Sequence, residues 1–99
     1  MVKISKPARE DLRQIHDYIA RDSRHYAHEV IIIILENIKL IESFPRKGRI
    51  VPEIQDDNIR EILVYSYRIV YRIRTSVEVA AVVHAKRDFS NAVKDRFSR

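Results

Sequence analysis

The clearest pattern in the chain is the alternation of apolar and polar positions in YSYRIVYRIR, residues 65–74. Successive side chains of a strand point to opposite faces, so this stretch predicts a strand with one core face and one arginine-bearing face. IREILVY, from Ile59, and VEVAAVVHA, from Val77, alternate in the same way. Short turns near residues 65–66 and 75–76 separate the three stretches, which predicts an antiparallel meander.

The N-terminal half follows a helical period instead. After a short predicted strand, VKIS, Pro7 suits the first turn of a helix that runs to about Ala20. Asp22 and Ser23 are candidate N-caps of a second helix, of about twenty residues, that ends before Pro45. The core-facing positions expected in the two helices are Ala8, Leu12, Ile15 and Ile19, and then Ala27, Val30, Ile34, Ile38 and Ile41.

This order of elements predicts an α+β fold. An N-terminal strand and a two-helix hairpin would pack on one face of the antiparallel sheet, and FSNAVKDRF would form a short helical tail. Residues 1–99 are enough for one self-supporting domain and too few for two. The segment PRKGRIVPE, which holds the only glycine, Gly48, is interpreted as the loop from the helices to the sheet.

A two-residue turn after Val64 would fix the register of the first two meander strands. Leu63 would lie opposite Arg68, and Glu61 would then share a face with Arg68 and Arg72. We expect this face to be exposed, so that replacing Arg68 by alanine would leave the domain folded. The opposite, core face would hold Ile62, Val64, Tyr67, Ile69 and Tyr71.

Composition and charge narrow the class of protein. With 45% apolar and 33% charged residues the chain has the balance of a soluble globular domain. Its formal charge of +5 and isoelectric point near 9.7 favour an acidic partner, whether nucleic acid, an acidic protein segment or a ribosome, over a generic basic surface. The segment PRKGRIVPE, called the central loop, carries Arg46, Lys47 and Arg49. It is either a solvated loop or a docking site for such a partner.

Several classes of site are excluded by residue content. The absence of cysteine excludes disulfides and thiolate metal sites. Early charges argue against a signal peptide, and no apolar run approaches the length of a membrane span, so we expect a cytoplasmic protein. His25 and His28 lack further ligands at suitable spacing, and a single glycine cannot build a phosphate-binding loop. No metal or cofactor is therefore expected.

One group of residue types fits RNA cleavage by attack of the 2′-OH. His84 is expected in step with Glu78 in the last strand, on the face that carries Arg68. Glu53 or Glu61 would be the general base, His84 the general acid, and Arg68 would stabilise the charge of the transition state. The alternative interpretation of His84 is a structural hydrogen-bonding residue.

The motifs AREDLRQIHDYI, FPRKGRIVPE, YRIVYRI and VVHAKRDF, taken in order, resemble the RelE/ParE superfamily of toxins from type II toxin–antitoxin systems of bacteria and archaea. The resemblance covers nearly the whole chain. It implies a helix hairpin against a twisted antiparallel sheet, which agrees with the fold predicted from periodicity.

Two branches of the superfamily cleave messenger RNA. RelE-like members cut it in the ribosomal A site, and Arg68 matches their strand arginine, whereas Ile59 and Glu61 stand where RelE carries two lysines. In the YoeB-like branch a glutamate, an arginine and a histidine do the chemistry. Glu53 and Arg68 fit that set, and His84 falls one residue from the expected place.

The ParE-like branch, which poisons DNA gyrase and has no known nuclease activity, resembles this chain more closely. The likeness lies in the long hairpin and in the C-terminal stretch VVHAKRDFSNAVKDRF. We therefore favour a gyrase-directed toxin without catalytic activity over a ribosome-dependent mRNA endonuclease. A basic nucleic-acid-binding module is the third alternative, although no recognition-helix signature is present.

The resemblance also implies partners. A cognate antitoxin would wrap its C-terminal segment over the toxin, adding a helix or a strand and neutralising a basic face in a hetero-oligomer. The cellular target would be DNA gyrase or the ribosome with its mRNA, and no membrane is involved. The residues expected to bind these partners are Arg46, Lys47, Arg49, Arg68, Arg72, Lys86 and Arg87.

Overall fold

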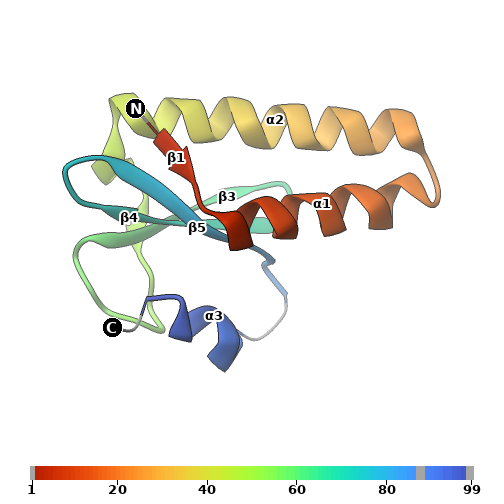
Figure 1. Cartoon of the computed structure of the whole chain (residues 1–99). Coiled ribbons are helices and arrows are strands. Elements are labelled where there is room, and N and C mark those ends of the chain that lie inside the picture. Colours follow the sequence, from red (N-terminus) through yellow and green to blue (C-terminus); the bar gives the residue numbers. More distant parts are fainter. Residues whose placement is uncertain (1, 87–88, 98–99) are drawn as a thin grey trace.

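The computed structural model describes residues 2–86 and 89–97 (Figure 1). The elements in chain order are β1 (Val2–Ile4), α1 (Lys6–Ala20), α2 (Arg24–Ser43), a 3₁₀ turn η1 (Pro45–Lys47), β2 (Arg49–Ile50), β3 (Ile59–Val64), β4 (Tyr67–Ile73), β5 (Val77–His84) and α3 (Asn91–Asp95). The α+β order predicted from the sequence is confirmed. The two-residue strand β2 and the turn η1 lie within the segment interpreted as a loop.

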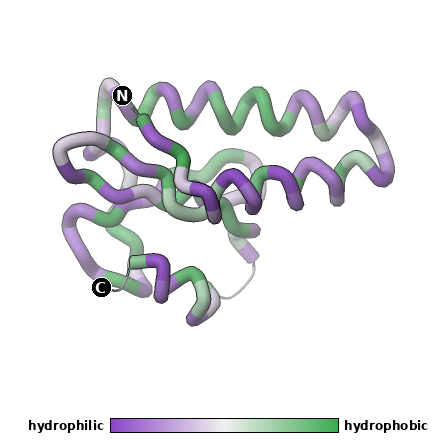
Figure 2. The backbone as a smooth tube through the Cα atoms, viewed as in Figure 1, coloured by the Kyte–Doolittle hydropathy of each residue, from purple (hydrophilic) through white to green (hydrophobic). Residues whose placement is uncertain are grey.

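The helix boundaries follow from local chemistry. The Ser5 hydroxyl accepts the N–H of Ala8 at 3.2 Å and opens α1, where Pro7 occupies the first turn. The Ser23 hydroxyl accepts the N–H of Tyr26 at 3.0 Å and opens α2, as predicted. The middle of α2 forms a long apolar stretch (Figure 2), and its five predicted core positions are all buried.

The five strands form one sheet in the order β1-β5-β4-β3-β2. β3 and β4 are antiparallel, with Leu63 opposite Arg68 and Glu61 opposite Val70, as predicted. β1 is parallel to β5, so the sheet is mixed rather than antiparallel throughout. The helix hairpin carries the chain across one face between β1 and the rest of the sheet, and such a crossover permits parallel pairing.

A β-bulge interrupts the pairing of β4 with β5. Val70 lies opposite Ala81, but the next residue, Tyr71, lies opposite Val79, so Ala80 is an extra residue in β5. A single extra residue exchanges the faces of all side chains beyond it relative to a regular strand. The bulge therefore determines which face of the sheet the last side chains of β5 occupy.

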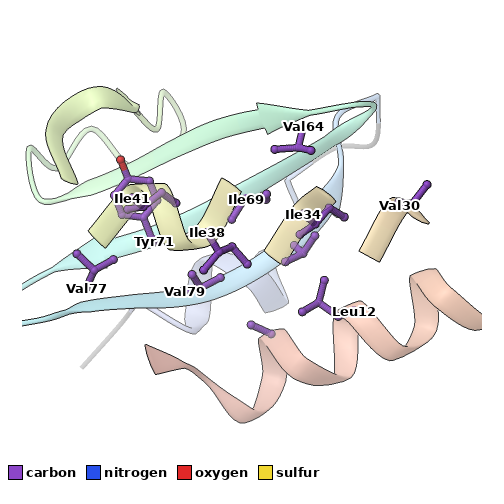
Figure 3. Packing of buried hydrophobic residues seen from close by; sticks show 12 residues of the cluster. Leu12, Val30, Ile34, Ile38, Ile41, Val64, Ile69, Tyr71, Val77 and Val79 are labelled. Atoms are coloured by element: carbon purple, nitrogen blue, oxygen red, sulfur yellow. The ribbon is translucent and has the colours of Figure 1, made fainter. Parts of the chain in front are cut away.

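The sheet separates two clusters of buried side chains. The face covered by α1 and α2, called the helix face, holds the larger cluster, in which Ile34 and Ile38 of α2 pack near Ile69, Tyr71 and Val79 (Figure 3). The opposite face, called the tail face, is covered by α3 and the residues around it (Figure 1). Its smaller cluster consists of Val51, Ile59, Val70, Ala81, Phe89 and Val93, with Ile54, Val83 and Phe97 at its border.

Gly48 explains how the turn η1 is held against the sheet. The buried hydroxyl of Tyr71 donates to the Pro45 carbonyl at 2.6 Å and accepts the N–H of Gly48 at 3.1 Å. A β-carbon at Gly48 would lie 2.6 Å from the carbonyl oxygen of Glu61 and would also contact the Tyr71 hydroxyl. The only glycine of the chain is thus required by a close approach of backbone to backbone.

Candidate functional site

Arg68 lies on the tail face and binds two carboxylates at once. Its Nε donates to Glu61 Oε1 at 2.6 Å, while Nη1 and Nη2 donate to the two oxygens of Glu53 at 2.9 and 2.6 Å. The pair with Glu53 is bidentate, which is the strongest geometry for an arginine and a carboxylate. Glu61 also accepts from Nε of Arg49 at 2.5 Å. The four residues form one network, called the Arg68 cluster.

Arg68 and Glu61 of this cluster are buried, whereas Arg49 and Glu53 are exposed, which corrects the expectation that Arg68 faces solvent. Glu61 is 1% exposed and Arg68 6% exposed. The ring of Phe89 lies 4.8 Å from the guanidinium carbon and covers it. The strand register was predicted correctly, so the error lay in treating the second face of the sheet as uncovered.

The charges in the cluster stabilise one another. The hydrogen bonds from Arg68 hold the pKa of the Glu53 carboxyl below its ordinary value, although burial acts in the opposite direction. Glu53, and then Glu61, raise the pKa of Arg68 against its own burial. Both shifts favour the charged forms of Glu53 and Arg68 at neutral pH.

The C-terminal segment 89–97 is tied across the sheet by a second ion pair. Arg96 donates to Asp11 of α1 at 2.7 Å and to the carbonyl of Ala80 at 3.0 Å. The Ser90 hydroxyl accepts the N–H of Val93 at 3.1 Å and opens α3. The sequence predicted the helical tail but not its packing against the sheet. Phe89, Val93 and Phe97 are spaced four apart, which is typical of one apolar face of a helix and could have indicated this packing.

His84 lies on the helix face, away from Arg68. It is opposite Tyr67, and the two rings meet edge to face with centroids 5.6 Å apart. The expectation that His84 is in step with Glu78 is wrong because the bulge at Ala80 exchanges the faces beyond it. Glu53 and Arg68 are thus brought together, and His84 is not.

The other residues expected to bind a partner are scattered. Arg46 donates to Asp57 at 2.8 Å, and Lys47 and Lys86 are exposed. Arg72 is partly buried, with its guanidinium 5.2 Å from the ring of Phe97. Arg49 belongs to the Arg68 cluster, and Arg87 lies outside the described residues.

Sequence reasoning missed Arg60, which joins the central loop to the sheet. It donates to the carbonyl of Gly48 at 2.9 Å and to Asp57 at 2.9 Å.

In residues 2–86 and 89–97 no three His, Cys, Asp or Glu side chains are grouped as for a metal ion. No helix in the same ranges is both long and apolar enough to cross a membrane.

Comparison with known proteins assigns this architecture to a class. The solved structure of the chromosomal ParDE toxin–antitoxin system from P. aeruginosa has the same fold, with a TM-score of 0.72 over 86% of this chain and 95% of that chain, at 17% identity. Residues 2–89 match the family model for the ParE toxin of the type II toxin–antitoxin system parDE. The chain therefore belongs to the ParE toxin family, and it is the toxin of a type II toxin–antitoxin system. No curated protein sequence matches it significantly.

Proposed function

We propose that this toxin arrests growth by acting on DNA gyrase and that it is not a ribonuclease. The observation that carries the proposal is the enclosure of Arg68, the one residue that all ribonuclease interpretations of the sequence require. Its Nε and both Nη nitrogens bond to carboxylates, and Phe89 covers the guanidinium. A phosphate could reach this arginine only if the C-terminal segment moved away and Glu53 were displaced.

Acid–base cleavage of RNA at the Arg68 cluster would lack a general acid. A general base and a general acid must both reach the reacting phosphodiester, within hydrogen-bonding distance or through one water. Glu53 binds Arg68, whose side chain lies on the tail face. His84 is opposite Tyr67 and lies with it on the helix face, so Glu53 and His84 are on opposite faces of the sheet. These residues support a structural role for the Arg68 cluster and a non-catalytic mode of action for the toxin.

The partner that restrains the toxin is, in this proposal, a cognate antitoxin. The related structure carries the name of a ParDE toxin–antitoxin system. The chain has a formal charge of +5, which favours an acidic segment as the neutralising element. Because gyrase acts on chromosomal DNA, the proposed site of action is the cytoplasm.

Two assays with the purified full chain test the proposal in parallel. The first follows gyrase supercoiling and traps cleaved DNA, and the second follows the integrity of mRNA on programmed ribosomes. We expect gyrase inhibition with intact mRNA. Codon-positioned cuts in the mRNA, with gyrase unaffected, would refute the proposal. An Ile34→Asp variant, purified identically and unfolded by a charge in the core, controls for contaminating nucleases and gyrase inhibitors.

A further inference from the structure

One carboxylate, that of Asp11 in α1, joins three parts of the fold. It accepts the N–H of Val82 in β5 at 3.0 Å, and it pairs with Nη1 and Nη2 of Arg96 at 2.7 and 3.2 Å. Arg96, which caps α3, also donates to the carbonyl of Ala80 at 3.0 Å. The side chains of Arg96 and Asp11 are 25% and 15% exposed, so water and salt screen their attraction only in part. This pair fastens the C-terminal segment 89–97 to a helix and a strand at once.

The pair takes the place of a strand at this edge of β5. β1 pairs with β5 only from Val77 to Val79, and the N–H of Ser5 donates to the carbonyl of Val79 at 2.9 Å. Within residues 2–86 and 89–97, no strand pairs with this edge beyond Val79. The carbonyl of Ala80 and the N–H of Val82 belong to buried residues, where an unpaired group costs about as much as a lost hydrogen bond. Detachment of the C-terminal segment would remove the side-chain partner of the Ala80 carbonyl.

The other attachments of the C-terminal segment are few. Phe89 and Val93 are its buried apolar side chains. The rings of Phe89 and Phe97 lie 4.8 and 5.2 Å from the guanidinium carbons of Arg68 and Arg72. α3 has five residues, and a helix this short is not stable in water without packing. The segment cannot keep its structure when it leaves the sheet, so it should attach and detach as a unit.

The rest of the molecule does not depend on this segment for its main core. None of the described residues in 89–97 belongs to the larger apolar cluster, on the helix face. Ala8 and Leu12, close to Asp11 in α1, are buried in that cluster and hold α1 in place without Arg96. A region with few buried apolar contacts opens at a lower free energy than the whole fold. An open state with the sheet and the helix hairpin intact should therefore lie below global unfolding.

We propose that the C-terminal segment is a latch and that the Asp11–Arg96 pair is its lock. Breaking this one pair would open residues 89–97 as a unit and leave the sheet and the helix hairpin folded. Opening would remove both phenylalanine rings from Arg68 and Arg72, so the latch controls whether water and solutes reach the arginines of the tail face. Because the lock is electrostatic, added salt should favour the open form. The latch would be present whichever target the toxin acts on.

Hydrogen exchange of the backbone amides in the ¹⁵N-labelled full chain tests the latch. The reporters are the amides of Lys94 and Phe97, each of which donates to a carbonyl within the segment at 3.0 Å. The reference is the amide of Ile34, in the middle of α2. Asp11→Asn removes the charge of the lock and keeps its shape. We expect exchange roughly tenfold or more faster at both reporters, by one common factor, and unchanged exchange at Ile34.

Matched variants and salt distinguish a lock from a general support of the fold. Asp17→Asn removes an exposed, paired carboxylate from the same helix and should leave all three amides unchanged. Raising NaCl from about 0.05 M to about 0.5 M should speed exchange at Lys94 about threefold in the parent protein and not in Asp11→Asn. Arg96→Lys, which keeps the charge without the planar fork, should lie between the parent and Arg96→Met. Equal acceleration at Ile34, different factors at the two reporters, or no acceleration in Asp11→Asn and Arg96→Met would overturn the latch.

Discussion

The two faces of the sheet are built on different physical principles. The helix face is a continuous aliphatic cluster in which Ile34 and Ile69 are fully buried (Figure 3). The tail face holds Arg68 and Glu61 beside a small apolar cluster whose member Phe89 covers the guanidinium of Arg68. Apolar burial is non-directional, whereas a buried ion pair stabilises only when every partner is in place. On the helix face, the free energy of unfolding should thus fall when side-chain volume is removed. On the tail face, it should fall when one member of an ion pair is removed.

The largest effect should come from a cavity on the helix face. Ile69→Ala removes a fully buried side chain at the centre of the sheet and should lower the free energy of unfolding by about 4 kcal/mol. Urea denaturation followed by circular dichroism measures the change. Ile69→Val, which keeps most of the volume, should cost about 1 kcal/mol. Equal losses in the two variants would show that volume does not control this face.

Breaking the Arg68 cluster should come next. Arg68→Ala leaves Glu61 buried with Arg49 alone and should cost about 3 kcal/mol. This reverses the sequence-based expectation that the domain would tolerate the change. The double variant Glu61→Leu/Arg68→Met, which replaces the pair by apolar side chains, should recover most of the loss. Additive losses in a double-mutant cycle would contradict a coupled pair.

A smaller effect should come from the contact that joins the turn η1 to the sheet. In Gly48→Ala the new methyl group would collide with the Tyr71 hydroxyl and the backbone of Glu61, and we expect a loss of about 2 kcal/mol. Tyr71→Phe removes the obstructing hydroxyl and the hydrogen bond to Pro45. If the hydroxyl is the main obstacle, Gly48→Ala should cost less in a Tyr71→Phe background. An unchanged cost would place the collision at the Glu61 backbone alone.

The smallest expected effect is a change in pH dependence. The folded-state pKa of Glu53 lies below its ordinary value of 4.5, so its contribution to stability is present above that value and is lost as pH falls through the lowered pKa. Glu53→Gln should therefore flatten the fall in stability as the pH drops below the ordinary value of 4.5. Urea titrations at several pH values measure this slope. A slope equal to that of the parent protein would rule out a stabilising charge on Glu53.

Much of this architecture could be predicted from periodicity. The stripe from Ala27 to Ile41 specified the buried side of α2 in spite of the β-branched run, and alternation specified the pairing of Leu63 with Arg68. The bulge at Ala80 could not be predicted, because residues 79–83 are all apolar and do not distinguish the two faces, and no glycine marks an extra residue. That one residue moved His84 to the other face and separated it from Glu53 and Arg68.

The burial of Arg68 could not be predicted from its own strand. Its position depends on Phe89, twenty-one residues later in the sequence, and on Glu53 in the central loop. Alternation shows that two faces differ in polarity, but it does not show whether a later segment covers the polar one. Tertiary packing between distant segments decides whether such a face is covered. Here the C-terminal segment 89–97 covers it.

The central claim is that the Arg68 cluster holds the fold and does not act on the target. Its most direct test is gyrase inhibition by Glu61→Leu/Arg68→Met, measured at a temperature where circular dichroism shows the variant to be folded. We expect the inhibitory concentration to stay within about twofold of the parent protein, because no charge of this pair would contact gyrase. A folded variant that no longer inhibits gyrase would contradict the claim and would make the cluster part of the site of action.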